Sequence, residues 1–298
     1  MQLNFASGRH FRIVIAAVLA LLGIAAPAAR AASYSGTVLY PCTLPSNFAG
    51  GMTVSGGAAG QTVGYGTSAS NNSHALLWSG TAASAVDLQP TNLSGYDQSY
   101  ALGTNGTQQV GYGAGSGTGY NAHALLWSGT AGSAVDLNPT KLAGFTASYA
   151  LGTSGTQQVG DGYDSGASNW HALLWSGTAD SAVDLQPTNL TGFTQSQANG
   201  TNGIQQVGYG DGQALLWFGT ADSAVDLQLL LPATGTWTGS IAYTIDAAGN
   251  VYGTADGAFN GVTGTFAVEW SPVPEPTAVS LVVIAGIGML ARRRRNEV

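Results

Sequence analysis

The chain repeats a short apolar string at regular intervals, and this repetition constrains its fold more than any other feature. The string is His-Ala-Leu-Leu-Trp in three copies and Gln-Ala-Leu-Leu-Trp in a fourth. The copies lie at 74–78, 123–127, 171–175 and 213–217, so that successive tryptophans are 49, 48 and 42 residues apart. A period of this length indicates an array of equivalent structural units.

The same neighbours surround each copy. A valine-glycine element precedes the string, with its valine at Val63, Val110, Val159 and Val207. Ser-Ala-Val-Asp-Leu follows the string and ends at Leu88, Leu137, Leu185 and Leu227. A diverged fifth copy ends at Trp270, 53 residues after Trp217, and runs into Pro272 without a Ser-Ala-Val-Asp-Leu segment of its own.

Each unit contains four short apolar runs separated by Gly, Ser, Thr and Asn. Runs of this length between turn-forming residues favour strands over helices, and no sustained helical stripe appears in the body of the chain. In the Trp-ending string both faces of the expected strand are largely apolar, as in a strand sandwiched between two layers. In Ser-Ala-Val-Asp-Leu the aspartate suits an outer strand, where a carboxylate discourages edge-to-edge pairing.

Four strands in each of five units predict an all-β fold, specifically a β-propeller of five four-stranded blades. Residues 33–40 have strand character and are expected to supply the fourth strand of the last blade, which would tie the two ends of the array together. An open β-solenoid or array is the alternative. The predicted organisation is a signal peptide at 1–31, the repeat domain at 32–272 and a sorting signal with a hydrophobic helix at 273–298.

The charge of the repeat domain excludes several classes of partner. Between Ala32 and Pro272 the only cationic side chain, histidines aside, is Lys141, against thirteen carboxylates, which gives a formal charge of −12. Such a surface repels phosphate backbones and anionic lipid, so nucleic acid is not an expected partner. Cys42 is the single cysteine, so the fold has no internal disulfide; we interpret it as a small buried residue, with pairing to a partner as the alternative.

The N-terminus has the three-part layout of a secretory signal peptide. Arg9, His10 and Arg12 precede an apolar stretch from 13 to 26, and Ala29-Arg30-Ala31 forms a small-x-small cleavage site. The mature protein is therefore expected to begin near Ala32, outside the cytoplasm.

The C-terminus carries a second targeting signal. Val273-Pro274-Glu275-Pro276 is followed by fifteen apolar residues, 277–291, and then by four arginines, Arg292, Arg293, Arg294 and Arg295. As a helix the apolar run spans roughly 22 Å, which is short for a hydrocarbon core of about 30 Å. The arginines would stay on the cytoplasmic side. An ordinary C-terminal anchor is the alternative to a transient insertion.

This tail resembles the PEP-CTERM sorting signal of exported bacterial proteins. The resemblance implies cleavage by an exosortase-type membrane protease, in a Gram-negative bacterium that produces exopolysaccharide. The repeats resemble HAF extracellular repeats over most of residues 53–270, with His-Ala-Leu-Leu-Trp where that family usually has His-Ala-Phe-Leu-Trp. This second resemblance implies an extracellular protein and carries no catalytic motif.

Two sets of polar residues recur once per unit. His74, His123 and His171 could share a metal only if all faced a common channel, and the fourth unit has Gln213 there. The favoured interpretation is a histidine bonded to a backbone carbonyl and packed near tryptophan. The second set consists of carboxylates, which we expect to serve solvation and turn support. Glycoside hydrolysis requires two carboxyl groups within about 5–10 Å of one another, and one carboxylate in each unit does not supply such a pair. These carboxylates are Asp87, Asp136, Asp184 and Asp226.

Asp161 and Asp164 are candidate metal ligands, and the metal expected there is Ca²⁺. Their segment lacks the alternating aspartates and distant glutamate of a Ca²⁺ loop, so no cofactor is assigned. No motif for nucleophilic or metal-dependent catalysis is present, and the protein is not expected to be an enzyme.

The predicted function is therefore binding or structural, at the cell surface or in the extracellular matrix. The expected partners are matrix polysaccharide or a surface protein. A passive matrix component without a specific ligand is a second possibility. The alternative from another class is an enzyme that modifies extracellular polysaccharide, using Asp161, Asp164 or Asp211.

Overall fold

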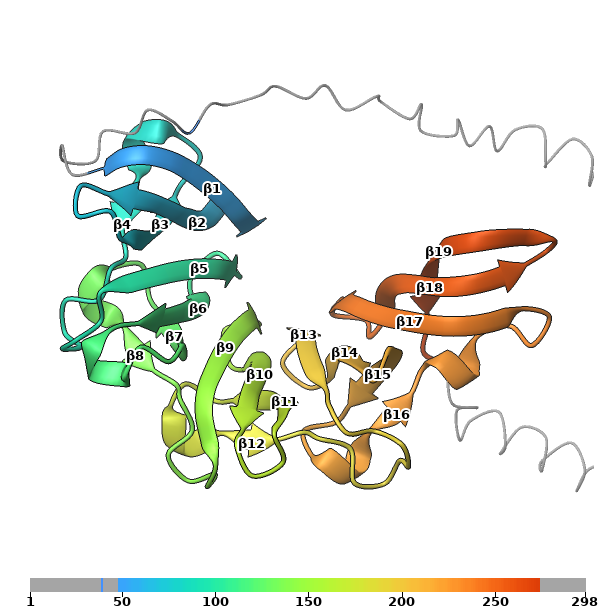
Figure 1. Ribbon diagram of the computed structural model, residues 1–298. Coiled ribbons are helices and arrows are strands. Elements are labelled where there is room, and N and C mark those ends of the chain that lie inside the picture. The colour runs from blue at the N-terminus through green and yellow to red at the C-terminus, as the bar shows by residue number, and fades with distance from the viewer. Residues whose placement is uncertain (1–38, 40–47, 274–298) are drawn as a thin grey trace, which may run out of the picture. The chain divides into compact units, whose positions relative to one another are not determined.

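The computed structural model describes Leu39 and residues 48–273, and within them the chain is all-β (Figure 1). Five antiparallel sheets follow one another along the sequence, and the only helices there are short 3-10 turns. The described residues include no helix long and apolar enough to cross a bilayer. The predicted signal peptide at 1–31, Cys42 and the predicted sorting signal from Pro274 onward lie outside the described residues.

Each of the first four sheets contains four strands in sequence order, as the repeats predict. The first sheet is β1 (Phe48–Ala58), β2 (Gln61–Ser68), β3 (Ser73–Trp78) and β4 (Val86–Asp87); the second is β5 (Gln98–Thr104), β6 (Gln109–Ala114), β7 (His123–Trp127) and β8 (Val135–Asp136). The third is β9 (Phe145–Thr153), β10 (Gln158–Asp164), β11 (Asn169–Trp175) and β12 (Val183–Asp184). The fourth is β13 (Gln197–Thr201), β14 (Gln206–Gly210), β15 (Gln213–Trp217) and β16 (Val225–Asp226).

The fifth sheet has three strands among the described residues, β17 (Thr236–Ile245), β18 (Val251–Phe259) and β19 (Val262–Trp270). This agrees with the absence of a Ser-Ala-Val-Asp-Leu segment after Trp270. The prediction that residues 33–40 supply the missing strand falls almost wholly outside the described residues and stays a prediction.

The glycine of each valine-glycine element is required by a close approach of two strands. A Cβ on Gly111 of β6 would lie 1.9 Å from the carbonyl oxygen of Tyr100 on β5, at a position next to a β-bulge. The equivalent glycines of the other four sheets meet the same obstacle at 1.8 to 2.0 Å. Since no side chain fits there, glycine recurs in every unit for a steric reason.

Neighbouring sheets bury the two faces of the Trp-ending strand, as predicted. On β7, Leu125 and Trp127 belong to the core shared with the first sheet, whereas Ala124 and Leu126 belong to the core shared with the third. Two more cores of the same kind join the third sheet to the fourth and the fourth to the fifth. Each fully buried leucine contributes roughly 1.5–3 kcal/mol, so these four cores hold the array together.

Two further repeated contacts join consecutive sheets. The hydroxyl of Ser148 on β9 accepts a hydrogen bond from the backbone N–H of Ala124 on β7, at 3.0 Å. The same bond recurs at three other sheet boundaries. The first strands also approach backbone to backbone, because a Cβ on Gly103 of β5 would lie 2.6 Å from the carbonyl oxygen of Leu151 on β9. The first strands of successive sheets therefore pack backbone against backbone.

Candidate functional site

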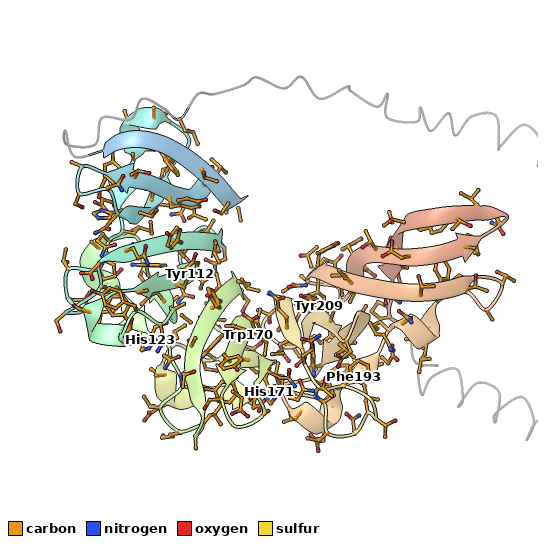
Figure 2. The ribbon with its side chains drawn as sticks, in the orientation of Figure 1. Tyr112, His123, Trp170, His171, Phe193 and Tyr209 are labelled. Atoms are coloured by element: carbon orange, nitrogen blue, oxygen red, sulfur yellow. The ribbon has the colours of Figure 1, made fainter. Side chains whose placement is uncertain are left out.

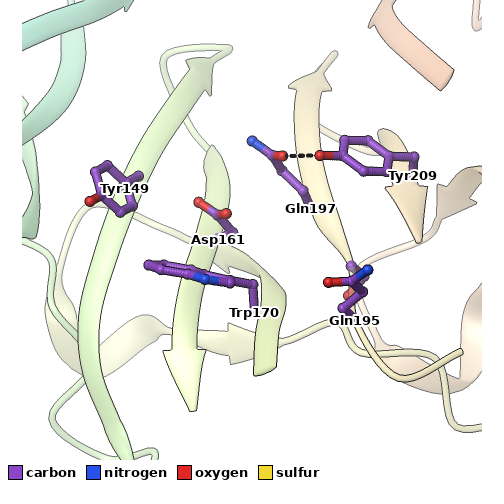
Figure 3. Close-up of a pocket in the computed structure, with 7 residues that line it drawn as sticks. Tyr149, Asp161, Trp170, Gln195, Gln197 and Tyr209 are labelled. Carbon is purple, nitrogen blue, oxygen red and sulfur yellow. Dashed lines mark hydrogen bonds between the residues drawn. The ribbon is translucent and has the colours of Figure 1, made fainter. Parts of the chain in front are cut away.

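A cavity of about 240 Å³ lies between the third and fourth sheets. Its lining comes from both sheets: Tyr149, Asp161 and Trp170 from the third, and Gln195, Ser196, Gln197 and Tyr209 from the fourth and the segment before it. Figure 3 shows the Asp161 carboxylate and the Trp170 ring between Tyr149 on one side and Gln197 on the other. An aromatic and polar cavity of this kind is typical of a small-ligand site.

The cavity exists because the third and fourth units depart from the repeat pattern at aligned positions. Asp161 occupies the place of the tyrosine in the valine-glycine element, where the second sheet has Tyr112. Trp170 precedes the histidine of its string, where the second unit has Ala122. Gln197 stands opposite Tyr209 in the register position that Tyr149 holds in the third sheet. A shorter side chain at 161 and at 197 leaves the space that the Trp170 ring borders.

Asp161 is the one carboxylate among the described residues that line the cavity. Burial raises the pKa of its carboxyl to about 7, and its only hydrogen bond among the described residues is to its own backbone. The carboxylate in turn helps to raise the pKa values of Tyr149 and Tyr209, for which burial is the larger cause. A half-buried carboxyl without an external donor has unused hydrogen-bonding capacity directed at the cavity.

Some polar side chains around Asp161 form hydrogen bonds within the protein, and others are available to bond a ligand. The hydroxyl of Tyr209 donates to Oε1 of Gln197 at 2.7 Å, which leaves the amide N–H groups of Gln197 without a partner among the described residues. Ser196 is committed to the fold, because its hydroxyl donates to Gln186 and accepts from the backbone of Ala172. The glutamines are therefore the groups that can hydrogen-bond a ligand beside Asp161.

A row of aromatic side chains reaches the cavity from the first sheet. Tyr65, Tyr100, Tyr112 and Tyr149 contact one another in turn, with ring centroids 4.7 to 4.9 Å apart. Trp170 follows Tyr149 at 5.5 Å. All five rings are partly exposed, and Figure 2 shows Tyr112 and Trp170 on successive sheets. The row thus offers a run of aromatic surface that ends at the cavity.

The repeated histidines do not form a common metal site. Nδ1 of His74, His123 and His171 lies 2.9, 2.9 and 3.0 Å from a carboxylate oxygen of the aspartate in its own sheet, Asp87, Asp136 and Asp184 respectively. The expected partner, a backbone carbonyl, was wrong. The strand register explains the difference, since each aspartate pairs with the leucine two residues after the histidine, as Asp87 does with Leu76, and therefore lies on the histidine's face of the sheet. No cluster of three or more metal-ligating residues occurs within the described range.

The outer-strand aspartates also support turns, as the sequence predicted. Asp136 accepts the backbone N–H of Asn138 at 2.8 Å, and its pKa is lowered by hydrogen bonds from His123, Tyr96 and that N–H, against the effect of burial. The fourth sheet has no histidine to pair with Asp226, and burial raises the pKa of this carboxyl.

Of the three carboxylates suggested for Ca²⁺ or catalysis, only Asp161 lines the cavity. Asp164 lies three residues further along β10 and therefore on the opposite face, where its carboxylate accepts the backbone N–H of Gly166 at 2.8 Å. Asp211 accepts the backbone N–H groups of Thr194 and Gln195. The structure does not bring these three carboxylates together.

Sequence reasoning singled out Asp161 but missed Trp170, Gln197 and the two tyrosines. The signal that could have found them is the set of departures from the repeat at aligned positions. No family model and no curated protein matches the chain.

Proposed function

We propose that this protein is an exported, cell-surface or matrix-associated β-propeller that binds polysaccharide in the cavity around Asp161. The observation that carries the proposal is the combination in one cavity of two partly exposed ring systems, Tyr149 and Trp170, with the side chains of Gln195 and Gln197. Aromatic faces pack against the apolar faces of sugar rings, while side-chain amides form hydrogen bonds with the sugar hydroxyl groups. The row of tyrosines that leads to the cavity favours an extended ligand such as a polysaccharide.

The propeller architecture rests on how consecutive sheets meet. Each pair shares an apolar core to which both sheets contribute, and the first strands approach backbone to backbone at glycines such as Gly103. These contacts support an assignment of the sheets as propeller blades, which are typically four-stranded. In this proposal residues 33–40 complete the fifth blade beside β19, and an open array remains the alternative arrangement.

Export and sorting follow from the two terminal signals. We place the repeat domain outside the cytoplasm, with transient insertion of residues 277–291 in the membrane and cleavage near Pro274-Glu275-Pro276 by an exosortase-type protease. The arginines 292–295 would stay on the cytoplasmic side during this step. Replacing Glu275 and the flanking prolines by alanine should leave an unprocessed, membrane-bound chain.

Binding is favoured over the alternative, hydrolysis of polysaccharide, by the number of carboxylates. Glycoside hydrolysis requires an acid and a second carboxylate about 5–10 Å away. Among the described residues that line the cavity, Asp161 is the single carboxylate, and Asp164 and Asp211 are engaged elsewhere.

The test is co-sedimentation of the untruncated exported protein with insoluble matrix polysaccharide from its host. We expect saturable retention that is reduced at least tenfold by Trp170→Ala and unchanged by Tyr120→Ala, which removes an exposed ring in the β6–β7 connection. Retention that is equal for the two variants would contradict the assignment of the cavity. Release of new reducing ends during incubation would favour the enzyme.

A further inference from the structure

We propose that the cavity recognises an ammonium group, so that the polysaccharide it binds contains amino sugars with a free or alkylated amine. This inference rests on the proposed function and narrows its ligand class. Its first support is that Asp161 has no donor from another described residue, although it lies in a cavity that both neighbouring sheets help to close.

No cationic side chain of the described residues pairs with this carboxylate. Within residues 48–273 the only lysine or arginine is Lys141, and its ammonium group is 3.1 Å from Asp180 on the surface. The described histidines are each bonded to the aspartate of their own sheet. Asp161 is therefore left available to a cationic ligand by the described residues, and the acidic domain around it favours the approach of cations.

The walls of the cavity suit an organic cation better than a metal ion. Tyr149, Trp170 and Tyr209 surround a single carboxylate, and aromatic faces attract ammonium groups through the ring quadrupole. Protein Ca²⁺ sites usually combine several carboxylates, whereas this lining has one. The described residues include no group of three metal-ligating side chains here or elsewhere.

The surroundings also indicate that the ammonium belongs to a sugar. The cavity, at about 240 Å³, is smaller than the roughly 300–1,000 Å³ typical of drug-sized ligands, which fits one sugar residue. Gln195 and Gln197 place amide groups beside the carboxylate for hydroxyl groups, and the partly exposed rings from Tyr65 to Tyr149 form a continuous aromatic surface for the next residues of a chain. A small free cation such as choline would use neither feature.

Binding of matched oligosaccharides at pH 8, where Asp161 is ionised, tests the inference. The probes are glucosamine oligosaccharides of one length that are either N-acetylated or N-trimethylated, together with choline, measured by calorimetry on the untruncated exported protein. We expect the trimethylated oligosaccharide to bind at least tenfold more tightly than the acetylated one. Asp161→Asn should abolish this preference, and choline should bind more weakly than the charged oligosaccharide.

The matched control is Asp164→Asn, which changes the same charge on the same strand but on the opposite face of β10. This variant should keep the preference, and loss of the preference there would overturn the inference. Equal binding of both oligosaccharides, unaffected by Asp161→Asn, would overturn the ammonium specificity while leaving the polysaccharide function in place. Binding of choline as tight as that of the charged oligosaccharide would overturn the amino-sugar assignment. Absence of binding by all probes would contradict the proposed function as well.

Discussion

Asp161 of β10 lies directly across from Tyr149 of β9, in the register position where the second sheet pairs Tyr112 with Tyr100. In the second sheet the two tyrosine rings stack with their centroids 4.7 Å apart. In the third sheet the aspartate leaves the Tyr149 ring free to turn toward Trp170. One substitution within a repeat has therefore exchanged an aromatic pair for a carboxylate that faces aromatic rings.

The affinity for a permanently charged ammonium ligand should depend on pH through Asp161. The pKa of this carboxyl is about 7, so its ionised fraction rises between pH 6 and pH 8. The other titratable groups that face it, Tyr149 and Tyr209, have raised pKa values and stay neutral in this range. We expect the association constant of N-trimethylated glucosamine oligosaccharide to increase roughly tenfold from pH 6 to pH 8. Calorimetry should show a flat profile for Asp161→Asn, and a flat profile for the unmodified protein would contradict the prediction.

Removing the charge of Asp161 should stabilise the fold at alkaline pH. A carboxyl whose pKa is higher in the folded than in the unfolded state costs stability as pH rises from about 4 to 7, and the cost is complete above pH 7. We expect Asp161→Asn to raise the melting temperature at pH 8 by about 2–4 °C, which corresponds to roughly 1 kcal/mol for a domain of this size. At pH 4 the unmodified protein and Asp161→Asn should have the same melting temperature. A gain of the same size in Asp164→Asn would show that net charge, rather than burial, is the cause.

The bond between His171 and Asp184 should stabilise the protein in mildly acidic solution. The pKa of His171 is raised, chiefly by the hydrogen bond that its Nδ1–H donates to Asp184 and against the effect of burial, with Asp164 as a further negative group nearby. Its stabilisation is therefore full below the unfolded pKa of 6.5 and is lost as pH rises through the folded value. His171→Gln, which copies the residue at Gln213, should cost on the order of 1 kcal/mol at pH 5.5 and less at pH 8.5. Urea denaturation at both pH values measures the difference, and equal costs would argue against the ionic contribution.

The glycine of the valine-glycine element should tolerate no side chain. A methyl group at Gly111 would overlap the carbonyl oxygen of Tyr100, so Gly111→Ala should destabilise the protein by about 1–3 kcal/mol or prevent folding. Gly132 is the control, because a Cβ there would have its nearest neighbour, an oxygen of Thr91, at 3.7 Å. Gly132→Ala should change the free energy of unfolding by less than about 0.5 kcal/mol. Thermal unfolding of the two variants distinguishes them, and equal losses would contradict the steric explanation.

Much of the fold could be predicted because its signals are local. Alternation, turn residues and the period of the tryptophans predict the strands of each sheet, and the missing segment after Trp270 predicts that the fifth unit itself supplies three of the four strands of its blade. The histidine partner was predicted wrongly because it depends on register. His74 and Asp87 are thirteen residues apart in sequence, and only the pairing of β3 with β4 brings them to 2.9 Å.

The repeating strands and the acidic character of the domain can be predicted from the sequence, because they follow from residue types and their spacing along the chain. The tertiary structure alone decided that Asp161, Trp170, Gln197 and Tyr209 line one cavity. These residues come from two units, and their meeting depends on how two sheets pack face to face. The pKa of Asp161 has the same origin, since the burial that raises it is provided by strands nearly fifty residues apart.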